Sequence, residues 1–522
     1  MQAEEPGRGG KAEFSSDPLI FFTVLGFVTL VIFAAWTDLP DLRAFLLALQ
    51  DGIAEGFSWF FSLTVSLLLA FAIWLIFSRH AHVKLGADDS QPDFSLLSWL
   101  SMLFSAGMGI GLVFFGVAEP VLHFLHPPAA EPMSLAAARD AIQLSVFHWG
   151  LHAWAIYAVL GASLAYFHHR GKEPLAIRST LRPLLKSHTH RLPGKFVDIL
   201  AVIGTLFGLA TSLGLGAIQI NAGLSSLYGF SQSALTQALI IVLITFCATT
   251  SLVTGLDKGI RRLSELNMLL AAALLAFVLL AGPSVELLRG LPEHLGNYLQ
   301  SVVGLGLRTN VFGSIEWQKA WTIFYWAWWL SWAPFVATFI ARISRGRTIR
   351  EFVLGVLLAP TLVALLWFGV FGGAALDIEM AELAATNTGA GIGAAVEADS
   401  ATAIFVLLDH FPFPNLTAML AIFLITVFFI SSSDSGSFVV DMLTSGGNPN
   451  PPVWQRIFWA SLEGLLAIVL LLIGGLNALQ AGAISLGLPF CFLLLLVMVA
   501  FVKELNESAA VTPAKGGRQR QP

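Results

Sequence analysis

Apolar segments long enough to cross a membrane recur along the whole chain, and they limit what it can fold into. A helix needs about 20 apolar residues to cross roughly 30 Å of hydrocarbon. Segments of this kind lie at 18–36, 53–78, 96–118, 141–166, 197–225, 232–254, 265–283, 318–341, 352–376, 415–443, 454–474 and 481–502. Only 12% of the 522 residues are charged, against about 25% in a typical soluble protein. We therefore predict an all-α integral membrane protein with about twelve transmembrane helices.

Three stretches between these segments are too polar to span a bilayer: 119–139, 284–316 and 377–412. We expect them to be loops or amphipathic helices that lie on the membrane surface. Glu119 and Pro120 are interpreted as the end of the third span.

Lysine and arginine predict the orientation, because cytoplasmic loops are enriched in both. One set of alternate loops holds only five of the 28 basic residues, namely Arg43, Arg139, Arg289, Arg308 and Lys319. The termini and the other loops carry the rest, so we expect both termini to be cytoplasmic.

Several function classes find no support in the sequence. The net charge of −5 and the lack of a basic domain argue against a nucleic-acid partner. No HExxH, Walker or well-placed GxSxG motif indicates an enzyme or an ATP-driven pump. Cys247 and Cys491 lie inside apolar segments, so we interpret them as small apolar residues and predict no cofactor.

Three alternating glycines, Gly107, Gly109 and Gly111, interrupt the third apolar segment. Each weakens a helix by roughly 1 kcal/mol relative to alanine. Small residues allow close helix packing, whereas a break in a membrane helix frees backbone groups to bind an ion or a solute. Both interpretations stay open at this stage.

The tenth segment carries five serines and Asp434 between Ser431 and Ser437. A serine in a membrane helix usually bonds back to its own backbone, and an intramembrane carboxylate is costly unless it is paired or faces water. Hydroxyl and carbonyl oxygens are also the ligands that hard cations prefer. This segment is therefore a candidate cation site.

Aromatic residues are concentrated in the fourth and eighth segments. Interfacial belts normally occupy the ends of spans, but Trp329 and Trp332 lie near the middle of theirs. Several aromatic faces together can hold a methylated ammonium group, each contact contributing about 0.5–2 kcal/mol when desolvated. Pro334 predicts an interruption in the eighth helix. His148 and His152 are one helical turn apart but lack an evident third metal ligand, so we expect them to serve packing.

These segments together resemble the betaine/choline/carnitine transporter family. The resemblance rests on the glycine motif of residues 107–111, on Trp321 to Phe352, and on Ser431 to Gly447. It implies the inverted-repeat fold of the leucine transporter, with two five-helix repeats behind two extra N-terminal helices. It also implies a homotrimer in the inner membrane of a bacterial cell.

The resemblance also implies roles for individual residues. The aromatic cage would consist of Trp149, Trp154, Tyr157 and Trp329, adjoined by Trp332. The carboxylate of the solute would meet the backbone of Gly107, Met108, Gly109 and Gly111, helped by Ser212. One sodium site would use Ser105, Met108, Phe428, Ser431 and Ser432. A second sodium site would use Thr205 and Phe335.

Two departures from the family pattern bear on the function. Leu209 stands where sodium-coupled members carry a second threonine, which weakens the second ion site. Gly111 stands where choline-selective members often carry an aspartate, which favours a zwitterion over a cation. We expect sodium-driven import of glycine betaine or a similar quaternary-ammonium solute.

Two alternatives stay open. One is proton-coupled or exchange transport of choline, carnitine, ectoine, taurine or dimethylsulfoniopropionate. The other is an osmosensing receptor that does not transport.

The predicted organisation divides the chain into six parts: a cytoplasmic tail (1–17), two extra helices (18–95), a first repeat (96–285), an extracytoplasmic loop or amphipathic helix (286–317), a second repeat (318–502) and a short cytoplasmic tail (503–522).

Overall fold

The computed structural model describes residues 16–37, 39–254, 256–311, 313, 315–386, 391–448 and 451–511, with side chains at all of these except 39, 105–106, 251–261 and 509–511. In these ranges the regular structure is helical, and one bridge joins Lys84 to Thr348. The α-helices are α1 (Pro18–Thr37), α2 (Leu39–Phe77), α3 (Leu96–Gly107), α4 (Gly109–Leu125), α5 (Leu135–Trp149), α6 (Leu151–Ala165), α7 (Arg182–Leu185), α8 (Leu192–Tyr228), α9 (Ala234–Thr254), α10 (Leu256–Ala281), α11 (Ser284–Gly306), α12 (Ile315–Gln318), α13 (Phe324–Arg342), α14 (Ile349–Trp367), α15 (Gly373–Thr386), α16 (Ile392–Ala398), α17 (Ala403–Asp409), α18 (Pro414–Thr444) and α19 (Val453–Val511).

The prediction of an all-α membrane protein is confirmed. Within the described residues, nine helices are long and apolar enough to cross a membrane, or ten if the bent pair α3–α4 is one span. Helix α19 covers two of the predicted spans, and its backbone leaves the helical conformation at Gly474 and Gly475. The number twelve and the division into two inverted repeats stay predictions.

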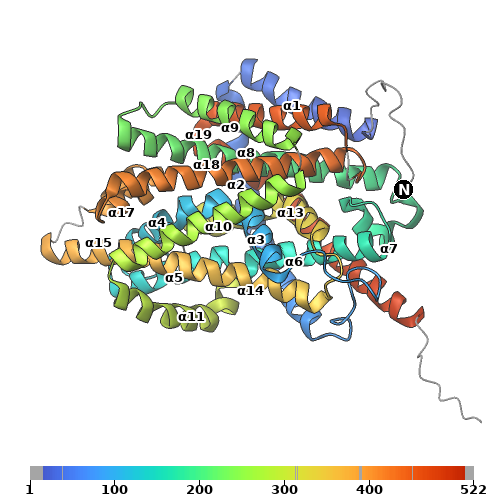
Figure 1. The fold of residues 1–522 in the computed structure, drawn as a ribbon, viewed down its shortest axis with the longest axis horizontal. Coiled ribbons are helices and arrows are strands. Elements are labelled where there is room, and N and C mark those ends of the chain that lie inside the picture. The colour runs from blue at the N-terminus through green and yellow to red at the C-terminus, as the bar shows by residue number, and fades with distance from the viewer. Residues whose placement is uncertain are drawn as a thin grey trace, which may run out of the picture.

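Helices α4, α6 and α13 form the centre of the protein and are buried on nearly every side. A helix that is apolar all round belongs in such a position. Helix α8 packs against α13, α18 and α19, and Figure 1 shows α8, α18 and α19 running side by side. The residues expected to bind solute therefore lie in the interior and not on the lipid-facing surface.

Two central spans are broken where the sequence holds glycine. The chain bends by 65° between α3 and α4, at Met108. A second break separates α5 from α6 at Gly150, whose backbone (φ −99°, ψ −138°) is not helical. At the second break the backbone N–H of Leu151 donates to the hydroxyl of Tyr298 (3.0 Å) instead of to its own helix, which shows how a break makes backbone groups available to other partners.

Several boundary predictions were wrong. Glu119 and Pro120 do not end the third span, because α4 continues through both to Leu125. Pro334 does not interrupt its helix: α13 runs continuously from Phe324, and the irregular π-helical turn precedes it, at Lys319–Ile323. The last helix continues beyond residue 502 to Val511, and Lys503 donates to the carbonyl of Pro183 in α7 (3.0 Å). The stretch after residue 284, for which either a loop or an amphipathic helix was expected, contains helix α11, whose buried residues are Leu287, Tyr298 and Gly306.

Candidate functional site

Large aromatic side chains press against the break between α3 and α4. A Cβ added to Gly107 would lie 2.4 Å from the indole of Trp154, and one added to Gly111 would lie 2.5 Å from the indole of Trp149. Real carbon atoms do not approach so closely, so these positions require glycine. The two interpretations of the glycine motif therefore hold together: the glycines admit close packing, and the helix breaks among them at Met108.

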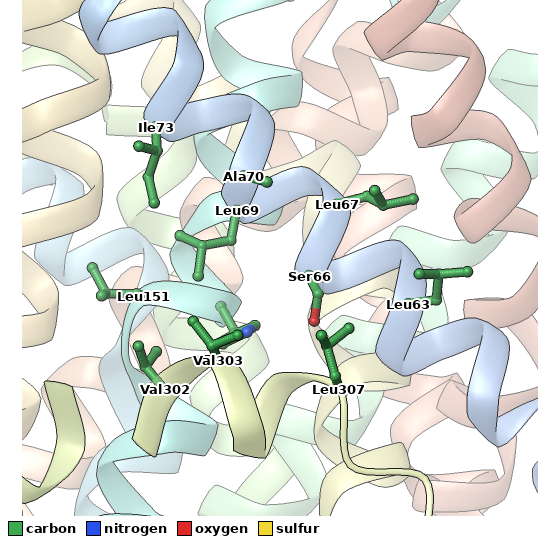
Figure 2. A pocket seen from close by; sticks show the side chains of 11 residues that line it. Leu63, Ser66, Leu67, Leu69, Ala70, Ile73, Leu151, Val302, Val303 and Leu307 are labelled. Carbon is green, nitrogen blue, oxygen red and sulfur yellow. The ribbon is translucent and has the colours of Figure 1, made fainter. Parts of the chain in front are cut away.

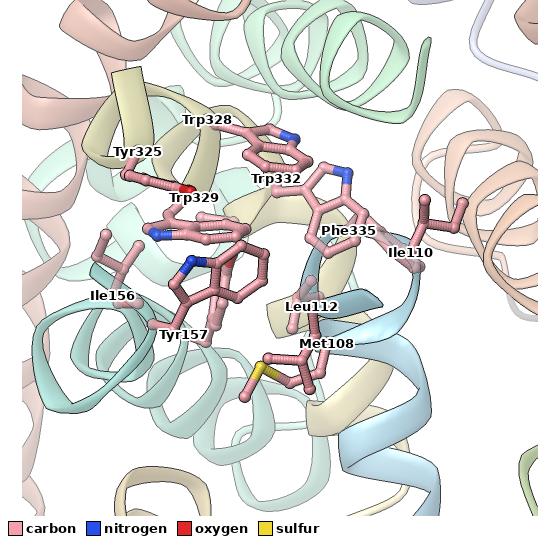
Figure 3. Packing of buried hydrophobic residues seen from close by; sticks show 14 of the residues in the cluster. Met108, Ile110, Leu112, Ile156, Tyr157, Tyr325, Trp328, Trp329, Trp332 and Phe335 are labelled. Atoms are coloured by element: carbon pink, nitrogen blue, oxygen red, sulfur yellow. The ribbon is translucent and has the colours of Figure 1, made fainter. Parts of the chain in front are cut away.

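Figure 3 shows Tyr157 of α6 and Trp329 and Trp332 of α13 close to Met108 at this break. The ring centroids of Trp149 and Trp329 are 4.8 Å apart, with their planes at 73°. Trp154 and Tyr157 form a second pair, 5.4 Å apart. Trp332 continues the row along α13, 6.3 Å from Trp329. All five are buried, so an ammonium group held among them would be shielded from water, which strengthens its attraction to the rings.

Hydrogen bonds fix the orientation of the cage. The indole N–H of Trp329 donates to the backbone carbonyl of His148 (2.9 Å). The indole N–H of Trp149 donates to Oε2 of Glu119 (2.9 Å), and the hydroxyl of Tyr325 donates to the same oxygen (2.5 Å). The phenol of Tyr157 has no hydrogen-bond partner among the described residues. The indole N–H of Trp332 likewise has no partner among the described residues. The cage therefore combines fixed rings with two buried polar groups that a solute could engage.

The serine-rich part of α18 faces the same break from the other side. The amide of Asn267 donates to Oγ of Ser431 (2.9 Å), and this hydroxyl donates to the carbonyl of Phe428 (3.0 Å). The hydroxyl of Ser432 has no partner among the described residues and lies 3.1 Å from the position of a Cβ on Gly109. Neutral oxygens so arranged suit a small alkali cation, because hard cations take oxygen ligands.

Comparison with known proteins decides which family this is. Residues 19–510 match the protein family described as 'BCCT, betaine/carnitine/choline family transporter'. The chain belongs to this family. Its members are transporters, so this protein is a multi-pass membrane transporter and not an enzyme, as the sequence predicted.

Individual relatives of this BCCT transporter are similar over most of their length. It is 44% identical to a glycine betaine transporter of Acinetobacter baylyi, over 92% of this chain and 71% of the relative. It is 42% identical to the glycine betaine transporter OpuD of Bacillus subtilis, over 94% of both chains. It is 44% identical to a glycine betaine/proline/choline/ectoine transporter of Vibrio parahaemolyticus, over 89% of this chain and 82% of the relative.

The remaining predicted site residues of the transporter are less clearly engaged. The side chain of Ser105 lies outside the described residues. The hydroxyl of Ser212 donates to the carbonyl of Gly208 on its own helix (3.3 Å). The hydroxyl of Thr205 is buried without a partner among the described residues, and Phe335 packs on Trp332 at 5.5 Å. Leu209 lies against Gly436, where it brings only methyl groups to the α8–α18 contact.

The sequence analysis did not predict the roles of two polar residues of the BCCT transporter, Glu119 and Asn267. Glu119 is buried and also contacts Nδ1 of His148 (2.6 Å) and Nε2 of His123 (3.2 Å). The three side chains lie close enough together to be considered a metal site, although the carboxylate already accepts bonds from Trp149 and Tyr325. His152 is not part of this cluster, and Gly150 breaks the helix between the two histidines.

Asn267 donates to Ser431 from α10. Its role was not predicted, because a single amide at the start of an apolar segment gives no recognisable pattern in the sequence.

A groove of about 320 Å³ lies between α2, α6 and α11 (Figure 2). It is lined by aliphatic side chains such as Leu69, Val303 and Leu307, with Ser66 and His152 as its polar members. Its lining contains no Phe, Tyr or Trp ring and no carboxylate, ammonium or guanidinium group, so it suits a methylated ammonium zwitterion poorly. The break between α3 and α4 is therefore the better candidate for a solute site.

Proposed function

We propose that this transporter imports glycine betaine, or a similar small quaternary-ammonium zwitterion, by symport with sodium. One observation supports the proposal most directly: aromatic rings and oxygen atoms that can bind a cation lie beside the same broken helix. Gly111 touches Trp149, and Gly109 faces the hydroxyl of Ser432.

The solute would lie with its ammonium group among the cage rings and its carboxylate toward the backbone of the break. The rings attract a desolvated cation by about 0.5–2 kcal/mol each. Helix α4 begins directly after the break, at Gly109, and a helix N-terminus favours a negative charge. Gly111 adds no charge of its own, which suits a zwitterion better than a bare cation. The names of the three relatives, all of which include glycine betaine, support this choice.

Sodium would bind at Ser431, Ser432 and the carbonyl of Phe428, with Met108 and Ser105 of the break completing the site. Because ion and solute would both order the same break, each would raise the affinity for the other, as linkage requires. Thr205 and Phe335 would form a second, weaker site, since Leu209 offers no ligand oxygen. We also propose a homotrimer in the bacterial inner membrane with both termini cytoplasmic.

Uptake by the purified protein in proteoliposomes tests the proposal. Labelled glycine betaine should accumulate when an inward sodium gradient is imposed, and should not when a proton gradient replaces it in sodium-free buffer. A panel of choline, carnitine, ectoine, taurine and dimethylsulfoniopropionate ranks the alternative solutes by competition. Accumulation without sodium would overturn the coupling, and binding without accumulation would identify a receptor.

A further inference from the structure

A second intramembrane carboxylate faces the serine-rich stretch of α18 from α19. Glu463 is buried, and the hydroxyl of Ser437 donates to its Oε2 (2.8 Å). The hydroxyl of Ser433 lies 3.5 Å from its Oε1. Ser433 and Ser437 are one helical turn apart and so share a face of α18. Ser431, in contrast, accepts a hydrogen bond from Asn267 of α10. Helix α18 therefore presents Ser433 and Ser437 to α19 and Ser431 to α10.

The charge of Glu463 is not compensated by a basic residue. Two other buried carboxylates have guanidinium partners: Asp198 lies 3.2 Å from Arg178, and Asp441 lies 3.7 Å from Arg456. Among the described residues Glu463 forms no ion pair, and its hydrogen-bond partners are the two serine hydroxyls. An ionised carboxylate in such a position is very costly.

The helices that pack around Glu463 do not supply the missing charge. Helix α9, whose Thr245 packs against Gly464, contains no acidic or basic residue. Helix α18 carries only acidic groups, Asp434 and Asp441. The other elements that pack on α19 also carry acidic and basic residues. These are Asp41, Arg43, Asp51 and Glu55 of α2, His152 of α6, Arg178 of the turn before α7, Arg182 of α7, Lys195 and Asp198 of α8, and Arg342 of α13. In the part of the chain that is described, none of these bonds to Glu463.

We propose that Glu463, with Ser433 and Ser437, is a proton-binding site within the membrane. A proton added to the carboxylate gives a neutral acid, whose O–H donates to one serine while the other serine still donates to its second oxygen. The residues next to Glu463 are tightly packed, since a Cβ on Gly464 would lie 2.5 Å from Oγ1 of Thr245. A proton fits such a place because it requires no additional space. Loss of the proton would leave an uncompensated charge between α18 and α19, so transport should depend on pH through this residue.

Infrared difference spectroscopy on the full-length protein in lipid tests the site directly. A pH titration of the wild type should show a carboxylic acid band that disappears in Glu463→Gln. The matched control is Glu379→Gln, which alters another buried carboxylate, one that accepts a bond from the backbone N–H of Gly393 (2.7 Å). The control should keep the band. In Ser437→Ala the band should move in frequency, because the acid loses a hydrogen bond. A set of acid bands identical in wild type and Glu463→Gln would overturn the proposal.

The consequence for transport rests on the proposed function and is measured separately. Uptake by the wild type should fall several-fold as the pH rises through the range in which the band is lost, and uptake by Glu463→Gln should not. If no solute is transported but the band is present, the proposed function fails and the proton site stands. If uptake is normal and its pH profile is the same in both proteins, the proton site fails and the transport function stands.

Discussion

The indole N–H of Trp149 donates to the carboxylate of Glu119 over 2.9 Å, although the two residues lie on different helices. The same carboxylate accepts a bond from Tyr325 of α13. Glu119 thus joins α4, α5 and α13 at the outer edge of the cage, and it sets the position of a ring that touches the glycine break. It is a positioning residue for the proposed solute site.

Replacing Glu119 with glutamine should loosen this wall of the cage. Trp149 and Tyr325 donate to one oxygen, Oε2, and two histidines contact the other, Oε1. The N–H₂ group of the amide must therefore face either both donors or both histidines, and a buried hydrogen-bonding group left unsatisfied costs about 1–3 kcal/mol. We expect the affinity for glycine betaine to fall at least tenfold, about 1.4 kcal/mol, measured by calorimetry on detergent-purified protein. Glu379→Gln is the control. Unchanged affinity in Glu119→Gln would show that the cage holds its shape without the carboxylate.

Trp329→Leu tests the cage itself. Leucine keeps an apolar side chain but removes the π face, so affinity for a quaternary ammonium should fall by about 1–2 kcal/mol. The amount of folded protein in the membrane should change little, because the replaced residue stays apolar. Tight binding by this variant would mean that Trp329 serves packing alone.

Gly111→Ala tests the close approach of rings to the break. The added methyl group would lie 2.5 Å from Trp149 and 3.0 Å from Trp328, so the rings must shift. We expect a loss of solute affinity of at least tenfold, about 1.4 kcal/mol. The matched control is Gly296→Ala on α11, where nothing lies within 4 Å of the added carbon. Equal uptake by both variants would contradict the proposed site.

Ser431 and Ser432 should determine the requirement for sodium. Replacing both with alanine removes two hydroxyl ligands, so the sodium concentration for half-maximal uptake should rise at least roughly tenfold, or about 1.4 kcal/mol. Ser461→Ala is a suitable control, because that hydroxyl bonds only to its own helix, at the carbonyl of Ile457 (2.8 Å), on an exposed surface. A double variant with unchanged sodium dependence would place the ion elsewhere.

The sequence by itself determined the class of the protein and the kinds of residue at its centre. Long apolar segments require membrane helices because hydrocarbon offers no partners for the backbone. Three glycines in such a segment, or tryptophans in the middle of one, stand out for the same reason: a plain span does not need them. Trp329 and the glycine motif could therefore be singled out from the amino-acid sequence, and the resemblance to the family added Trp149.

Only the tertiary structure decided which polar residues meet. Glu119 and Trp149, Asn267 and Ser431, and Glu463 and Ser437 each lie on separate helices. Their contact depends on how each helix is rotated about its axis and packed on its neighbours, which hydropathy does not specify. Helix ends were misjudged for a related reason. A buried glutamate or proline resembles a stop signal in the sequence, but bonds from neighbouring helices allow α4 to continue through Glu119 and Pro120 to Leu125.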